Sequence, residues 1–143
     1  MKIALDAMGT DTRPAPDVQG AVMAAREFGI TVLLVGDETK IKTELAKHDT
    51  HGLDLPVVHA PSDIGMTEHI EAVKAKKDAS MNVAMRLVRE KQADAFVTAG
   101  NTGAAMAAAI AGPFLLGRIK GVKRPALTAT LPTAVGRTLF LDI

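Results

Sequence analysis

Short, continuous apolar segments alternate along this chain with longer segments in which apolar residues recur at helical spacing. The short segments are rich in aliphatic and β-branched residues and lack the apolar–polar alternation of a sheet with one face in water. Such strands are typical of parallel sheets that helices cover on both faces. The sequence therefore predicts an α/β fold, with three αβα layers around a mostly parallel sheet. The predicted strands are 2–7, 31–35, 56–59, 93–99, 126–131 and 138–143.

Helices are predicted between these strands. Gly29 stands where a left-handed residue would end the first helix, and Asp37 is suited to cap the second. The segment 102–116 is rich in alanine and almost uncharged, so a helix there would be buried on most sides. The predicted helices are 14–28, 38–47, 80–91 and 102–116.

The last predicted strand, 138–143, is followed by no crossover and no polar tail. A parallel strand normally continues into a crossover connection. We therefore expect residues 1–143 to form the N-terminal part of a larger enzyme, with the rest of the sheet and of the site lying after Ile143. The alternative is a short protein that ends naturally in an edge strand.

Composition argues against several classes of function. The 143 residues include no cysteine, which removes disulfides, thiolate metal sites and cysteine nucleophiles. The formal net charge is +1 and there is no Trp or Tyr, so nucleic-acid binding is not expected. The histidines form no metal-ligand pattern, and we expect neither a metal nor a cofactor. No targeting or membrane-spanning segment is evident, so we expect a cytoplasmic protein.

The turn 98–104 gives the clearest indication of a ligand site. Gly100 and Gly103 would let a ligand approach the backbone, and unpaired N–H groups at the start of the following helix favour an anion. Asn101 and Thr102 add an amide donor and a hydroxyl. A tight strand-to-helix turn capped by Thr102 explains the pattern equally well. The P-loop and GxGxxG fingerprints of nucleotide sites are missing.

Two carboxylates flank Gly9 at the end of the first predicted strand. Asp6 and Asp11 could bind a metal, orient a basic residue or transfer a proton. Helix capping explains Asp11 more simply, whereas Asp6 lies inside an apolar run and is harder to explain by structure alone.

Two groups of basic residues could attract an anionic substrate or an acidic partner protein. Solvent-exposed segment ends would explain both groups equally well. One group precedes the helix predicted at 80, and the other precedes the strand predicted at 126. They are Lys74, Lys76 and Lys77, and Lys120, Lys123 and Arg124.

Several motifs, each weak alone, occur in a characteristic order along the whole chain. They are LDAMGTD at 5–11, GAV at 20–22, LVGD at 34–37, IGM at 64–66, KKDASM at 76–81, AGNTGA at 99–104, GRI at 117–119 and RPAL at 124–127. The ordered set resembles the acyl-(acyl carrier protein):phosphate acyltransferase family of bacterial phospholipid synthesis. The resemblance implies a fold similar to the isocitrate/isopropylmalate dehydrogenase-like fold, and members that continue beyond the strand that ends here.

The resemblance also implies a reaction. Inorganic phosphate attacks the thioester of an acyl carrier protein, which gives acyl phosphate and the free carrier thiol. Phosphate is itself the nucleophile, so the reaction requires no cysteine or serine nucleophile. The partners implied are the acyl carrier protein and inorganic phosphate, with a homodimer in the full-length protein and loose membrane association.

Under this resemblance the candidate residues fall into three groups. The expected catalytic residues are Asp6, Lys77 and Asn101. The residues expected to bind phosphate or the acyl group are Gly9, Asp11, Lys76, Ser80, Gly100, Thr102 and Gly103. The residues expected to dock the carrier protein are Lys74, Lys120, Lys123 and Arg124.

The sequence departs from the family pattern at a few positions. Thr10 stands where a second glycine is usual, and it would strain the loop if that position required a positive φ. Ala15 replaces a common acidic residue, and Gly112-Pro113 interrupts the last predicted helix, where we expect a kink or a changed register. Two alternatives remain: a non-catalytic module that binds phosphate or the carrier, and a dehydrogenase of the related fold, which the missing dinucleotide fingerprint disfavours.

Overall fold

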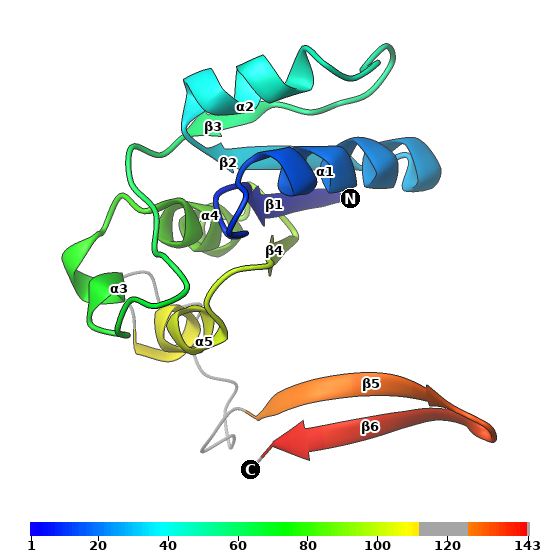
Figure 1. The fold of residues 1–143 in the computed structure, drawn as a ribbon, viewed down its shortest axis with the longest axis vertical. Helices are drawn as coiled ribbons and strands as arrows, with labels where there is room; N and C mark the ends of the chain where they lie inside the picture. Colours follow the sequence, from blue (N-terminus) through cyan, green and yellow to red (C-terminus); the bar gives the residue numbers. More distant parts are fainter. Residues whose placement is uncertain (112–125, 143) are drawn as a thin grey trace.

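The computed structural model describes residues 1–111 and 126–142. Strands and helices alternate through most of the first of these segments, and the second contains strands only (Figure 1). In chain order the elements are β1 (Lys2–Asp6), α1 (Ala15–Phe28), β2 (Thr31–Gly36), α2 (Glu38–Leu45), β3 (Val57–His59), α3 (Ala72–Ala75), α4 (Ser80–Arg89), β4 (Ala95–Thr98), α5 (Thr102–Ala111), β5 (Leu127–Thr133) and β6 (Gly136–Asp142).

The first four strands form one parallel sheet in the order β3-β2-β1-β4. The chain adds β2 and β3 on one side of β1 and then places β4 on the other side. The direction of winding therefore reverses between β1 and β4. In open parallel sheets, ligands bind beyond the carboxyl ends of the strands at such a reversal.

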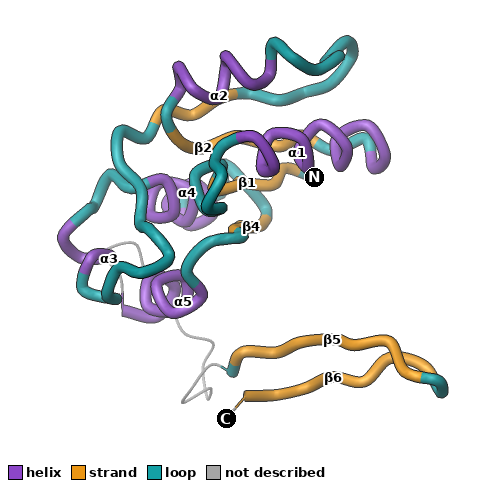
Figure 2. The backbone as a smooth tube through the Cα atoms, viewed as in Figure 1, coloured by secondary structure: helices purple, strands orange, loops and turns teal. Residues whose placement is uncertain are grey.

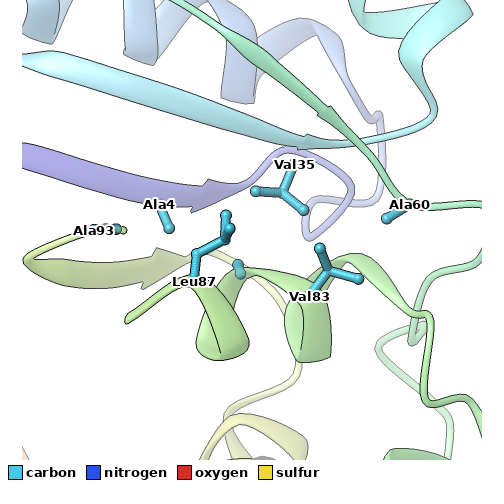
Figure 3. Close-up of a cluster of buried hydrophobic side chains, with 7 residues drawn as sticks. Ala4, Val35, Ala60, Val83, Leu87 and Ala93 are labelled. Carbon is cyan, nitrogen blue, oxygen red and sulfur yellow. The ribbon is translucent and has the colours of Figure 1, made fainter. Parts of the chain in front are cut away.

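Helices cover both faces of this sheet. Leu34 and Val35 are neighbours in β2, so their side chains point to opposite faces of the sheet. Both are fully buried, which shows that both faces are covered here. Leu34 packs with residues of α1 and α2, whereas Val35 packs with Val83 and Leu87 of α4 (Figure 3). The parallel α/β sheet and its three layers are therefore confirmed, and burial on both faces explains the continuous apolar strands.

The local signals for helix ends were accurate. Gly29 follows α1 with a φ of 61°, and its N–H donates to the carbonyl of Ala25. The carboxylate of Asp37 accepts a hydrogen bond of 3.1 Å from the N–H of Lys40 at the start of α2. The short helix α3 was not predicted, because four residues are too few to show a helical period. The predictions for 112–116, including the Gly112-Pro113 interruption, lie outside the described residues.

Strands β5 and β6 form a separate antiparallel pair (Figure 2). The pair places Ala129 opposite Phe140, and the turn between the strands uses Gly136 at a φ of 133°. The sequence located both strands but not their pairing. The expectation that 138–143 belongs to the mostly parallel sheet was wrong, because β6 pairs antiparallel with β5 in a sheet of its own.

Candidate functional site

The candidate site lies beyond the carboxyl ends of β1 and β4, where the winding of the sheet reverses (Figure 1). Hydrogen bonds join the end of β1 to the end of β4, and the turn after β4 to the loop before α3. The first turns of α4 and α5 contribute Ser80 and Thr102. Among the described residues, no group of three or more His, Asp or Glu side chains could hold a metal ion.

Asp6 is the buried carboxylate of this site. It is the last residue of β1, and only 2% of its surface is exposed. The Met8 N–H donates to one carboxylate oxygen at 3.2 Å, and the Thr98 hydroxyl donates to the other at 2.9 Å. The same Thr98 oxygen accepts the Gly100 N–H at 3.0 Å. Thr98 therefore links the carboxylate on β1 to the turn after β4.

The sequence reasoning missed Thr98 as a residue of the site. The available signal was a hydroxyl at the carboxyl end of an apolar strand, directly before the Gly100 turn. That signal becomes meaningful only when β4 is known to lie beside β1, which the linear order of the strands does not reveal.

Gly9 and Gly100 let the two loops touch. A Cβ added at Gly9 would lie 2.9 Å from the Gly100 nitrogen, and one added at Gly100 would lie 3.1 Å from the Gly9 Cα and carbonyl oxygen. Neither glycine has a φ in the left-handed region. The close approach that both glycines permit is therefore between the loops themselves.

Burial raises the pKa of Asp6, because the carboxylate loses hydration inside the protein. Hydrogen bonding from Thr98 and Met8 offsets part of this effect, and the negative charge of Asp63 adds to it. The nearby Ser80 hydroxyl also favours the carboxylate form. Ser80 is 1% exposed, and its oxygen has no hydrogen bond of normal geometry to any described residue.

A second buried carboxylate, Asp17, lies in the first turn of α1. The Thr10 hydroxyl donates to it at 2.6 Å. Burial raises the pKa of Asp17, and the charge of Asp6 adds to that effect. Thr10 is free of the anticipated strain, because among residues 1–111 and 126–142 Lys91 is the one non-glycine with a positive φ. The Thr10 side chain instead binds Asp17.

Asn101 fastens the loop before α3 to the start of α5. Its side-chain oxygen accepts the Ala104 N–H at 3.0 Å, so the cap of α5 is Asn101 rather than Thr102. Its amide nitrogen lies 3.3, 3.2 and 3.0 Å from the carbonyl oxygens of Gly65, Met66 and Glu68. The polar atoms of this side chain are therefore engaged within the protein.

Lys76 holds the same loop from the other side. Its ammonium contacts the Glu68 carboxylate oxygens at 2.6 and 2.9 Å and the Asp63 carbonyl at 2.9 Å. Hydrogen bonding from Lys76 is the main reason that the pKa of Glu68 is lowered. Arg13 makes a comparable pair with Asp63 at 3.2 Å. Two cations near the site are thus already paired with carboxylates.

The structure brings part of the predicted set together and leaves part of it apart. The buried carboxylate of Asp6 has three members of the set nearby, namely Gly9, Ser80 and Gly100. Two further members, Asn101 and Lys76, both bind Glu68. Gly103 lies one residue into α5, after Thr102. The exposed members of the set are Asp11, Lys74, Lys77 and Thr102. Lys120, Lys123 and Arg124 lie outside the described residues.

Replacing Asp6 with asparagine is expected to remove a pH-dependent loss of stability that the buried carboxylate causes. Because the folded-state pKa of Asp6 is raised from 3.8, the folded protein keeps this proton over a range where the unfolded chain has lost it. The Asp6 contribution to stability is therefore greatest below pH 3.8 and falls as the pH rises through the folded-state pKa. The stability of the native chain minus that of Asp6→Asn should decrease over this range and then level off.

Urea unfolding of both proteins at a series of pH values measures this difference. The titrations of Asp17 and Glu68 occur in both proteins, so most of their effect cancels. A difference that stays constant or increases with pH would show that the Asp6 carboxylate is not penalised by burial.

Comparison with a family model and with curated proteins indicates the family to which this chain belongs. Residues 1–143 match a family model described as fatty acid synthesis protein. A phosphate acyltransferase of Herpetosiphon aurantiacus is 52% identical over 143 residues, which are 99% of this chain and 38% of that relative. Phosphate acyltransferases of Geobacter sulfurreducens and Geotalea daltonii are each 51% identical over 144 residues, which cover 100% of this chain and 41% of each relative.

The chain spans about two fifths of the length of the curated relatives it matches. The matched range, residues 1–143, spans the positions of every motif in the ordered set. The chain therefore belongs to the family of fatty acid synthesis proteins, in which its curated relatives are phosphate acyltransferases.

Proposed function

We propose that this chain serves in acyl transfer from an acyl carrier protein thioester to inorganic phosphate, yielding acyl phosphate for phospholipid synthesis. The identity of about half of all residues to proteins named phosphate acyltransferase carries the proposal. The position of the AGNTGA turn supports it, because that turn follows β4 at the reversal of the sheet. These relatives favour acyl transfer over the dehydrogenase alternative.

The reaction requires that phosphate be held against a thioester carbonyl. A phosphate oxygen forms a bond to the carbonyl carbon, the carbonyl oxygen becomes an oxyanion, and the carbon–sulfur bond then breaks. The electron pair leaves on sulfur, and the thiolate takes a proton. The protein must therefore bind an anion, stabilise a second negative charge and supply a proton.

The first turn of α5 is the proposed phosphate site. The Asn101 side-chain oxygen accepts a hydrogen bond from the Ala104 N–H, and the Asn101 backbone carbonyl accepts one from the Ala105 N–H. The N–H groups of Thr102 and Gly103 make no hydrogen bond to a described residue, so they can donate to phosphate oxygens. We propose a positioning role for Asn101, because its amide already holds neighbouring carbonyls.

We assign the remaining roles to Asp6 and to the lysines at 74, 76 and 77. We propose that Lys77, exposed and without an ion pair among the described residues, stabilises the oxyanion. We propose that Asp6 transfers the proton, because it lies at the end of β1 beside this turn and burial raises its pKa. Lys76 can bind phosphate only by leaving Glu68, so a phosphate there would compete with that ion pair. Lys74 is proposed to meet the acidic carrier.

Other properties of the family are proposals for this protein as well. We infer the isocitrate/isopropylmalate dehydrogenase-like fold from the parallel sheet and its two helical layers. A homodimer, a cytoplasmic location and loose membrane association follow from the resemblance. No helix among residues 1–111 and 126–142 has the length and apolarity to cross a membrane.

The direct test uses a chimera in which residues 1–143 replace the matching part of the Geobacter sulfurreducens relative. We expect phosphate-dependent release of thiol from acylated carrier protein by the chimera, and little release by residues 1–143 alone. Lys77→Gln should lower kcat about 100-fold, the usual effect of removing one oxyanion donor. Lys40→Gln is the matched control, since Lys40 is an exposed lysine on α2.

Circular dichroism shows whether each protein folds. A folded chimera that releases no thiol in the presence of phosphate would contradict the proposed function. Equal loss in Lys77→Gln and Lys40→Gln would remove Lys77 from the mechanism.

A further inference from the structure

An apolar surface with a small cavity lies beside α3 and α5. Ile70 is 54% exposed and Met66 is 48% exposed, although both are large apolar side chains. The adjacent cavity has a volume of about 140 Å³. Its lining consists of Ile70, Glu71, Val73, Lys74 and Ala107. The cavity can admit one apolar side chain from another molecule.

Free positive charge accompanies this surface. Lys74 lines the cavity, and Lys77 follows three residues later. Neither lysine makes an ion pair with a described residue, in contrast to Lys76 between them. Glu71 is the carboxylate on the cavity wall. The free ammonium group of Lys74 can pair with an acidic group of a partner.

The surface is continuous with the candidate site. Asn101, next to the proposed phosphate-binding turn, holds the backbone carbonyls of Met66 and Glu68. The side chain of Ile70 also reaches α5, because a Cβ built on Gly103 would lie 3.7 Å from Ile70 Cγ2. A partner bound to Ile70 would therefore lie next to the N–H groups of Thr102 and Gly103.

We propose that Met66, Ile70, Lys74 and the adjacent cavity form the docking surface for the acyl carrier protein. The proposal rests on the proposed function, which requires an acidic carrier to present a thioester to this site. An apolar side chain of the carrier enters the cavity, and a carboxylate of the carrier pairs with Lys74. Ile70 is the central anchor, because it is both exposed and part of the cavity wall.

The shape of the surface favours a protein over a lipid bilayer. A cavity recognises a protruding side chain, whereas a bilayer presents no such group. The Glu71 carboxylate on the cavity wall would also face the negative headgroups of an anionic membrane. Both features suit a folded partner, which can insert one apolar side chain into the cavity and keep its own carboxylates away from Glu71.

The test compares two substrates in the same chimera: the acylated carrier protein, and an acyl-pantetheine thioester that lacks the carrier. Ile70→Glu and Lys74→Glu should each raise KM for the carrier substrate on the order of tenfold. The kcat/KM for the small thioester should stay unchanged. The effect of Lys74→Glu should decrease as salt is added, because the interaction is between exposed charges.

Met23→Glu and Lys40→Glu are the matched controls. Met23 is 60% exposed on α1, and Lys40 is an exposed lysine on α2. Neither control should change KM for the carrier. A parallel titration of fluorescent carrier protein against each variant measures binding without turnover. The proposal stands if binding weakens in the two test variants, even when a chimera without activity disproves the proposed function.

Several results would overturn the docking surface. An equal fall in activity toward the small thioester would assign Ile70 and Lys74 to folding or chemistry. An unchanged KM and unchanged binding of the carrier would remove the surface altogether. Variants that lose binding to vesicles of anionic lipid while carrier binding is unchanged would identify the surface as a membrane contact.

Discussion

Replacing Gly9 with alanine is expected to lower the free energy of unfolding of this chain by about 1–3 kcal/mol, the usual cost of overfilling a packed interior. The added Cβ would lie 2.9 Å from both the Gly100 nitrogen and the Thr98 hydroxyl oxygen. Cβ atoms in real proteins essentially never approach other atoms closer than 3.0 Å. The nearest atom is backbone, so a change of rotamer cannot relieve the contact, and the loops must separate.

The same separation would disturb the candidate site. Moving Gly100 away weakens its N–H bond to Thr98, and Thr98 is the hydroxyl that binds Asp6. We therefore expect Gly9→Ala to lower the activity of the chimera as well as its stability. Gly100→Ala should act in the same direction, because its Cβ would lie 3.1 Å from the Gly9 backbone.

Gly20→Ala is the matched control. Gly20 lies within α1, and a Cβ built there has no neighbour within 4 Å. Alanine in a helix is favoured over glycine, so this variant should gain about 0.5–1 kcal/mol. Urea unfolding of the three proteins measures both changes. A Gly9→Ala chain as stable as the native chain, beside a stabilised Gly20→Ala chain, would show that the two loops are not in close contact.

Features of the fold that depend on near neighbours could be read from the sequence. Asp37 and Gly29 act within a few residues of their own positions, so local rules located both helix ends. The apolar run that includes Leu34 and Val35 indicated burial on two faces, and the sheet is covered on both. The locations of β5 and β6 were also predicted. Their pairing was missed, because the turn near Gly136 carries no strong hairpin sequence.

The site was less predictable, because its bonds join distant parts of the chain. Asp6 and Thr98 are separated by 92 positions, and Asn101 lies 33 positions from Glu68. The side chain of Asn101 was expected to face a ligand, yet it binds three carbonyls of another loop. Residue type and local spacing give no information about such contacts, which depend on how strands far apart in sequence become neighbours.

Replacing Asn101 with alanine is expected to destabilise the chain by about 3 kcal/mol. The amide has two hydrogens, which the carbonyls of Gly65, Met66 and Glu68 share, so at most two full hydrogen bonds of about 1 kcal/mol each are lost. Loss of the cap on the Ala104 N–H adds about 1 kcal/mol. Urea unfolding of residues 1–143 measures the total.

Asn101→Asp separates the two contributions, because aspartate keeps the oxygen that caps α5 and removes the amide hydrogens. A negative oxygen would also face the carbonyls of the loop before α3. The free energy of unfolding of Asn101→Asp should therefore fall by at least the contribution of the amide hydrogens, about 2 kcal/mol. Thr102→Ala, at the exposed neighbouring position, should stay within about 0.5 kcal/mol of the native chain. If Asn101→Asp is as stable as the native chain, the amide does not fasten the loop, and the cap is the only structural contribution of this side chain. That result would release the amide of Asn101 for direct contact with substrate, and the positioning role proposed above would be replaced by a catalytic one.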